Sequence, residues 1–327
     1  MSRKSDSHRP PPSPPRPRLV AALPALLAVI LAAGCALRPA GGPGEQGTGK
    51  AEEAGAERVE VTDGIGRRVL LPRRPRRIVS LAPNVTETLF MLGAQDRLIG
   101  VTTLCAWPEA ARALPKIGDL LNPNYEVILA ARPDLVIGST AGNDRGAVTK
   151  LTGLGLPVYV VAPRSAEEIF RSVEEIGRIT DRAGEGRLLA ARMRARLDAV
   201  RRRIEGLPPV RAFFITWFDP LLAPGKNTFE NDVLALAGVV SISSDIPQYY
   251  PRYSLEQVLV SDPDAILTIE HEGDPLPRFD RTPGWKELRA VREGRVYFLS
   301  EYLQHPSPLF VDGVEDLARQ LYPERFR

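Results

Sequence analysis

The sequence predicts an α/β protein with two wound α/β lobes, joined by a single long helix, and a ligand cleft between the lobes. Three observations lead to this prediction. Short apolar strands alternate with helical segments in both halves of the chain, a pattern that favours parallel sheets. About 40 residues with helical periodicity, 165–206, separate the two halves. The segments NYEVILAARPDLVIG (124–138) and SLEQVLVSDPDAILT (254–268) also match in register, which indicates that one lobe is written twice.

The N-terminal segment has the pattern of an export signal. The first 18 residues are basic and Pro-rich, and about 15 apolar residues follow and end at Cys35. This run is short for a membrane span, which needs about 20 residues, so we expect a signal peptide over 1–34. A short anchor helix is the alternative. LAAGC resembles the bacterial lipobox, which implies a lipid-modified Cys35 that holds the protein at a membrane surface.

Residues 35–56 are expected to form a flexible tether. They consist mainly of Gly, Ala and charged residues, with almost no large apolar side chains, a composition that cannot build a core. The segment GEQGTGKA (44–51) matches the Gly-x-x-x-x-Gly-Lys pattern of a phosphate loop. No strand precedes it and Ala51 follows the Lys, so no nucleotide site is predicted.

The first lobe is predicted over 57–164. Asp63-Gly64 marks a hairpin turn, Asn84 or Thr86 is the expected cap of the first helix, and Gly93 is its expected end. The expected elements, in order, are a hairpin (57–72), a strand (78–81), this helix, a strand (97–102), the first copy of the repeat, and a strand (154–162).

The linker region is predicted over 165–208 and the second lobe over 209–327. Apolar residues of the linker fall at helical spacing, and 181–186 is a point at which it can divide into two helices. The second lobe is expected to contain a strand (211–217), a helix (231–238), the second copy of the repeat, a helix (285–291), a strand (295–300) and a terminal helix (308–322).

Composition limits the classes of function. Five of the 43 basic residues and one of the 40 acidic residues lie in the first 34 positions, so the remaining chain carries about −1. This balance argues against nucleic acid as a partner. With Cys35 modified, Cys105 has no cysteine to pair with.

Three segments carry a resemblance to a known family: 76–102, 123–138 and 253–268. They resemble the ABC-transporter solute-binding proteins of the iron-siderophore, haem and cobalamin group, and cobalamin-binding members in particular. The resemblance covers about residues 57–325. It implies a monomeric, exported binding protein, in the periplasm or on the outer face of the cytoplasmic membrane. Such a protein delivers a cobalamin or ferric chelate to a dimeric ABC permease and has no cofactor of its own.

The resemblance also gives a role to the glutamate that opens each copy of the repeat. Glu126 and Glu256 follow the predicted caps Asn124 and Ser254, and in this family such glutamates dock onto arginines of the permease dimer. The alternative is helix stabilisation alone, because a carboxylate in the first turn interacts favourably with the helix dipole.

Aromatic residues make up only 6% of the chain, and many of them lie in loops that follow strands, where open α/β sheets bind ligands. Such a cleft suits a large, flat, partly apolar ligand such as cobalamin. Tyr250 and Glu301 match pocket positions of the cobalamin binders, whereas Leu104, Leu120 and Ser139 replace aromatic residues found there. The predicted ligand-binding residues are Trp107, Trp217, Phe218, Tyr249, Tyr250, Tyr253, Glu301, Tyr302 and His305.

Other ligands and roles stay open at this point. Siderophores and haem carry negative charge and would need arginines from the set Arg145, Arg252, Arg278 and Arg281. His305 is either an axial metal ligand or an ordinary polar loop residue, and Cys105 either a soft ligand or a small buried thiol.

Three other classes of protein are alternatives. An exported enzyme is the remote alternative, because HEGDP (271–275) is not His-Glu-x-x-His and no Gly-x-Ser-x-Gly occurs. A zinc or manganese binder would need several histidines, and only His271 and His305 remain after export. A ligand sensor that works without a transporter has no distinguishing sequence feature.

Overall fold

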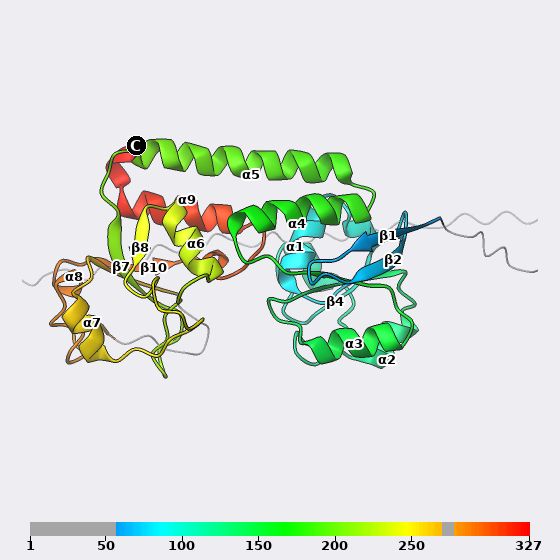
Figure 1. The fold of residues 1–327 in the computed structure, drawn as a ribbon, viewed down its shortest axis with the longest axis horizontal. Helices are drawn as coiled ribbons and strands as arrows, with labels where there is room; N and C mark the ends of the chain where they lie inside the picture. Colours follow the sequence, from blue (N-terminus) through cyan, green and yellow to red (C-terminus); the bar gives the residue numbers. More distant parts are fainter. Residues whose placement is uncertain (1–56, 270–277) are drawn as a thin grey trace, which may run out of the picture. The chain divides into compact units, whose positions relative to one another are not determined.

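The computed structural model describes residues 57–269 and 278–327. The predicted signal peptide, Cys35, the tether and His271 lie outside these residues. In the described chain, two four-stranded parallel sheets are flanked by helices (Figure 1), which confirms the predicted α/β class.

The two sheets have the same topology. The first contains β3 (Ile78–Ser80), β4 (Leu98–Val101), β5 (Leu135–Ser139) and β6 (Val158–Val161), and the second β7 (Val210–Ile215), β8 (Val239–Ser241), β9 (Ala265–Ile269) and β10 (Val296–Leu299). Their spatial orders are β4-β3-β5-β6 and β8-β7-β9-β10. With strands numbered in chain order within each sheet, both read 2-1-3-4. The repeated segment is therefore the third strand of each sheet together with the helix before it.

Helices alternate with these strands in both halves. They are α1 (Pro83–Met91), α2 (Tyr125–Ala130) and α3 (Arg145–Gly153) in the first half, and α6 (Phe229–Leu236), α7 (Leu255–Ser261) and α8 (Arg289–Arg292) in the second. α3 and β8 were not predicted. The helix predicted over 285–291 forms only from Arg289 onward. Trp285 instead packs against Phe279 and Phe218, with ring centroids 5.1 Å and 5.8 Å away.

The entry hairpin was predicted and is present. β1 (Arg58–Thr62) pairs antiparallel with β2 (Arg68–Pro72). Asp63 fixes the turn, because its carboxylate accepts the backbone N–H groups of Ile65 and Arg67 and pairs with the Arg67 guanidinium at 2.7 Å.

The predicted cap of α1 was wrong. The helix begins at Pro83, before Asn84, and its N-cap residue Ala82 makes no side-chain hydrogen bond. Proline is favoured in the first helical turn because it has no N–H to satisfy. Asn84 and Thr86 therefore lie inside the helix and bond elsewhere, whereas Gly93 follows the helix end, as predicted, with φ of 68°.

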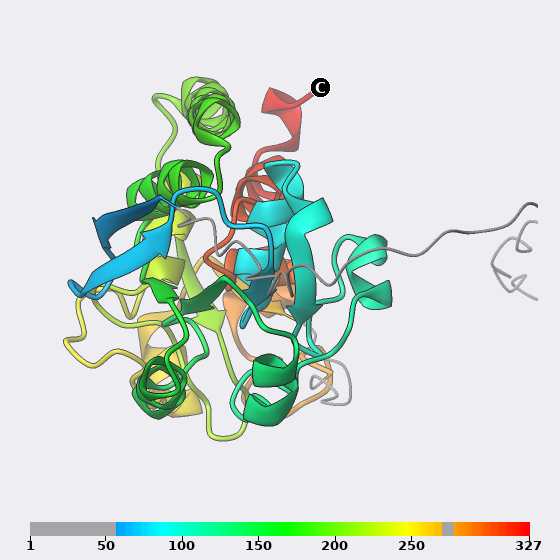
Figure 2. The same ribbon diagram turned by 90° about the vertical axis from the view of Figure 1, so that its right-hand side faces the viewer.

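The long helical region is two helices, α4 (Ala166–Ile179) and α5 (Ala183–Ile204). The chain turns between them at Asp181, which has φ of 56°. Gly177 and Gly186 lie at the helix contact, where a Cβ on Gly177 would come within 3.1 Å of the Gly186 Cα atom. α5 runs above the terminal helix α9 (Phe310–Leu321) (Figures 1 and 2).

One apolar core joins the two halves. It contains residues of β5 and β9 together with Phe170 of α4, Met193 of α5 and Phe310 of α9. Two smaller clusters cover the other faces of the sheets, around Val136 in the first sheet and Phe213 in the second. None of the helices in 57–269 and 278–327 combines the length and apolarity required to cross a bilayer.

Candidate ligand-binding site

A hollow of about 350 Å³ lies beyond the end of β7. It brings together three predicted ligand residues, Trp217, Tyr250 and His305. Trp217 and Tyr250 keep 45% and 42% of their surface exposed, which is high for such large rings. The other lining residues were not predicted: Thr216, Leu222, Glu230 and Gln304.

Backbone hydrogen bonds hold the two aromatic loops together. The Leu222 N–H donates to the Trp217 carbonyl at 2.9 Å, and Leu222 also forms a β-bridge with Arg252. The Gly225 N–H donates to the Tyr249 carbonyl at 2.9 Å. A Cβ atom at Gly225 would collide with the carbonyl oxygen of Gln248, so glycine permits this close approach. Trp217 and Tyr250 are therefore presented by two loops that support each other.

Glu230 forms part of the lining from the first turn of α6. Its side chain is only 5% exposed, and the Tyr250 hydroxyl donates to Glu230 Oε1 at 2.7 Å. Burial raises the pKa of Glu230, although the Tyr250 hydrogen bond opposes this effect. Burial and the neighbouring carboxyl also raise the pKa of the Tyr250 phenol. Sequence reasoning missed Glu230 because a first-turn glutamate is an ordinary feature of any helix.

Tyr249 lies beside this pair and meets the Tyr250 ring edge-on, with centroids 5.0 Å apart. Burial and the charge of Glu230 raise the pKa of Tyr249, while Arg164 opposes them. Arg164 lies between β6 and α4, so a cation of the first half acts on an aromatic residue of the second.

The remaining predicted ligand residues do not line this hollow. Phe218 and Tyr253 pack against the core of the second sheet, and the Tyr253 hydroxyl donates to the Ile242 carbonyl at 3.3 Å. Trp107 is half-buried in the loop after β4. Glu301 and Tyr302 belong to the short 3-10 helix η3 (Glu301–Leu303), directly before two lining residues, Gln304 and His305. Their assignment to the ligand stays a prediction.

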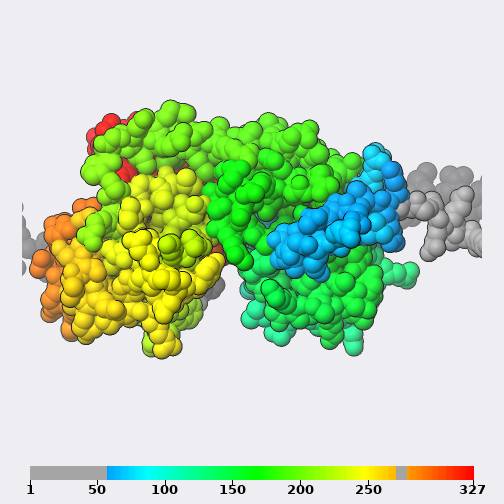
Figure 3. All heavy atoms as spheres, viewed as in Figure 1, coloured from blue at the N-terminus to red at the C-terminus, as the bar shows by residue number. Residues whose placement is uncertain are grey.

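The loop that carries His305 also contacts the first half. Asn84 Nδ2 donates to Ser139 Oγ at 3.0 Å and to the Pro306 carbonyl at 3.2 Å. The pKa of Glu87 is raised by burial and by the charge of Glu301, whereas the Ser307 hydroxyl beside its carboxyl lowers it. The hollow thus adjoins the contact between the halves, and Figure 3 shows the surface hollowed between them on the side opposite α5.

Two other residues singled out from the sequence are buried. Ser139 is fully enclosed and accepts the Asn84 bond, so its side chain is committed to the protein. Cys105 is a buried free thiol beside the hydroxyls of Thr86 and Thr102, at 3.1 and 3.2 Å.

The two predicted docking glutamates occupy equivalent places. Glu126 and Glu256 are each the second residue of their helix, α2 and α7, and both are exposed. The predicted caps are present, with Asn124 accepting from Val127 N–H and Ser254 from Gln257 N–H. Hydrogen bonds from its own backbone and from Ser254 lower the pKa of Glu256. Both helices lie on the side of the structure away from α5 (Figure 1).

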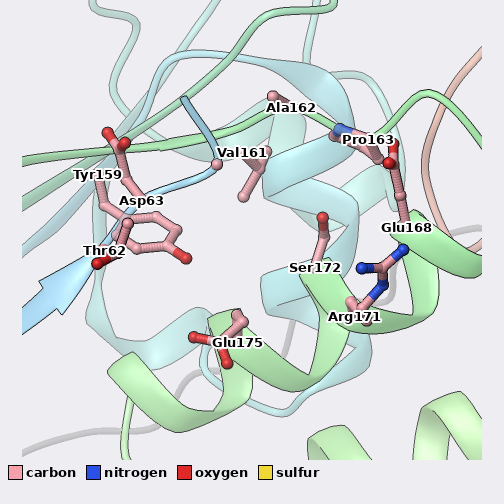
Figure 4. Close-up of a pocket in the computed structure, with 11 residues that line it drawn as sticks. Thr62, Asp63, Tyr159, Val161, Ala162, Pro163, Glu168, Arg171, Ser172 and Glu175 are labelled. Atoms are coloured by element: carbon pink, nitrogen blue, oxygen red, sulfur yellow. The ribbon is translucent and has the colours of Figure 1, made fainter. Parts of the chain in front are cut away.

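A second hollow, of about 260 Å³, lies between the entry hairpin, β6 and α4 (Figure 4). Burial raises the pKa of Tyr159 in it to about 12. The carboxylate of Asp63 is already committed to the hairpin turn. None of the predicted ligand residues lines this hollow. In the described part of the chain, no group of three His, Cys, Asp or Glu side chains is placed to hold a metal ion.

Comparison with known proteins identifies the family. A family model described as periplasmic binding protein matches residues 78–303. This chain belongs to the periplasmic binding protein family. Its relatives include the uncharacterized ABC transporter substrate-binding lipoprotein YvrC of Bacillus subtilis, 29% identical over 92% of this chain and 96% of that protein. The vitamin B12-binding protein of Vibrio cholerae is 31% identical over 76% of this chain and 90% of its own.

Solved structures of periplasmic binding proteins agree with this assignment. The periplasmic vitamin B12 binding protein BtuF of Vibrio cholerae has 30% identity and a TM-score of 0.68, with 77% of this chain and 99% of that chain covered. A periplasmic heme binding protein from Pseudomonas aeruginosa has 25% identity and the same TM-score, with coverages of 76% and 93%. The predicted resemblance to ABC-transporter solute-binding proteins and the predicted two-lobe α/β fold are thus confirmed. The general role of this chain is that of its family, whose members bind solutes for ABC transporters.

Proposed function

We propose that this protein captures a corrinoid of the cobalamin type between its two lobes and delivers it to an ABC permease. The observation that carries the proposal is the pair of exposed rings, Trp217 and Tyr250, at a hollow whose described lining contains no Lys or Arg. Exposed rings suit a large, flat, partly apolar ligand.

Haem or a ferric siderophore is the alternative ligand, and the similarity to a heme binding protein favours it. Haem propionates and siderophores with carboxylate or catecholate groups carry negative charge and would be expected to meet arginines. The four candidate arginines are exposed, and Arg278 and Arg281 lie beside Asp280, at 3.4 and 3.6 Å. None of the four lines the hollow that contains Trp217.

Delivery is proposed to use Glu126 and Glu256. Both are exposed, and each is the second residue of the helix that precedes the third strand of its sheet. A permease dimer can therefore meet one carboxylate on each half. Cys35 is proposed to carry the lipid that keeps the protein at the membrane, with the tether allowing it to reach the permease.

A binding titration tests the ligand. The purified protein is titrated with cyanocobalamin, haemin and a ferric hydroxamate, and binding is read by tryptophan quenching and calorimetry. Sub-micromolar affinity for cyanocobalamin alone is expected. Tight binding of haemin or the hydroxamate with none of cyanocobalamin would contradict the corrinoid proposal and leave the family assignment untouched.

A further inference from the structure

Glu230 is buried, and it is the one carboxyl in the described lining of the hollow that contains Trp217. The ionisable side chains of the described lining are Glu230, Tyr250 and His305. The hydrogen bonds of Glu230 come from Tyr250 and from its own backbone, and no Lys or Arg of the described chain pairs with it. A buried glutamate is normally paired with a cation, so the core packing leaves this residue unexplained.

Burial raises the pKa of Glu230 on balance, and two features of its position oppose this effect by favouring the ionised form. It is the second residue of α6, where the helix dipole attracts negative charge, and the Tyr250 hydroxyl donates to it. A carboxylate offers about four acceptor sites, and the bonds from Tyr250 and from its own backbone use about two of these. The remaining capacity can accept N–H groups of a ligand, and it repels a ligand carboxylate at the same place.

We propose that Glu230, held by Tyr250 at this hollow, selects ligands by charge: it accepts ligands that present amide N–H or cationic groups and rejects those that present carboxylates. The inference rests on the proposed function in that it names the class of ligand for the same site. Corrinoids whose peripheral side chains are amides satisfy it, whereas haem propionates and carboxylate siderophores do not.

The experiment compares two ligands that differ in one group. Cyanocobalamin and its separated monocarboxylic acid derivatives, in which one peripheral amide is hydrolysed, are titrated against the full chain. The wild-type protein should bind at least one of the acids about tenfold more weakly than the parent amide. Glu230→Gln should reduce this ratio to about twofold or less, because Gln keeps an acceptor for Tyr250 but removes the charge.

Two control variants separate charge from structure. Glu287→Gln makes the same chemical change on the exposed surface and should keep the wild-type ratio. Tyr250→Phe removes the 2.7 Å bond but keeps the carboxyl, so it should keep discrimination even if overall affinity falls. An unchanged ratio in Glu230→Gln, with thermal unfolding like that of the wild type, would overturn the inference.

A second pair of ligands keeps the inference testable if no corrinoid binds. Haemin and its dimethyl ester differ only in whether the propionates are charged. Preference of the wild type for the ester, lost in Glu230→Gln, would support charge selection while the corrinoid proposal fails. Preference for free haemin in both the wild type and Glu230→Gln would overturn charge selection as well as the corrinoid proposal.

Discussion

Asn84 of α1 donates one hydrogen bond to Ser139 within the first lobe and another to the Pro306 carbonyl of the second, 222 residues along the chain. The side chain is buried. Ser307, the residue after Pro306, acts on the Glu87 carboxyl of the first lobe and lowers its pKa. The residue before Pro306 is His305, which lines the candidate site. The contact between the lobes and the ligand loop are therefore parts of one short segment.

Replacement of Asn84 tests this contact. Asn84→Ala leaves the Pro306 carbonyl without its donor in a buried place, which should cost about 1–3 kcal/mol of the free energy of unfolding. Urea denaturation measures the loss, and Asn122→Ala on the exposed surface is the control. An effect no larger than that of the control would show that the contact contributes little.

The raised pKa of Glu87 predicts a dependence of stability on pH. The folded protein holds the proton of Glu87 more tightly than the unfolded chain does, so stability is fully present below about pH 4.3 and falls as pH rises through the folded pKa. Ser307, Glu301 and Tyr302 are the groups that interact with it. Glu87→Gln should therefore raise the melting temperature at pH 8 and leave it unchanged near pH 4. Equal shifts at both values would contradict this cause.

Removal of the Trp217 ring should weaken ligand binding. Trp217→Ala deletes an exposed face of the hollow, and losses of about tenfold or more are typical when such an aromatic anchor is truncated. Calorimetry with cyanocobalamin measures the change, with Leu188→Ala on the exposed face of α5 as the control. Affinity equal to that of the wild type would place the ligand elsewhere.

Reversal of the two docking charges should separate uptake from binding. The double variant Glu126→Arg and Glu256→Arg should abolish uptake in cells, because each carboxylate would be replaced by a charge that repels the arginines proposed on the permease. Ligand affinity of the purified variant should stay unchanged. Glu109→Arg with Glu324→Arg provides the same charge change away from α2 and α7. Loss of affinity in the docking variant, or equal loss of uptake in the control, would contradict the assignment.

The sequence predicted the repeat well and the hollow only in part. Both copies of the repeated segment form the predicted helix and strand, with the predicted caps Asn124 and Ser254, because caps and apolar runs are local signals. β8 has three residues and depends on pairing with β7, which no local pattern encodes. Glu230 resembles an ordinary first-turn acid, and only the approach of Tyr250 from a distant loop distinguishes it.

The continuous core beneath α4, α5 and α9 has a consequence for how this chain loses its structure. Leu267 of β9 and Leu135 of β5 belong to the same apolar cluster, so neither copy of the repeat can melt without exposing apolar surface of the other. Scanning calorimetry should record one heat-absorption peak, with equal calorimetric and van't Hoff enthalpies. Two copies of one sequence pattern would then behave as a single cooperative unit, and two separate peaks would show that the copies unfold independently.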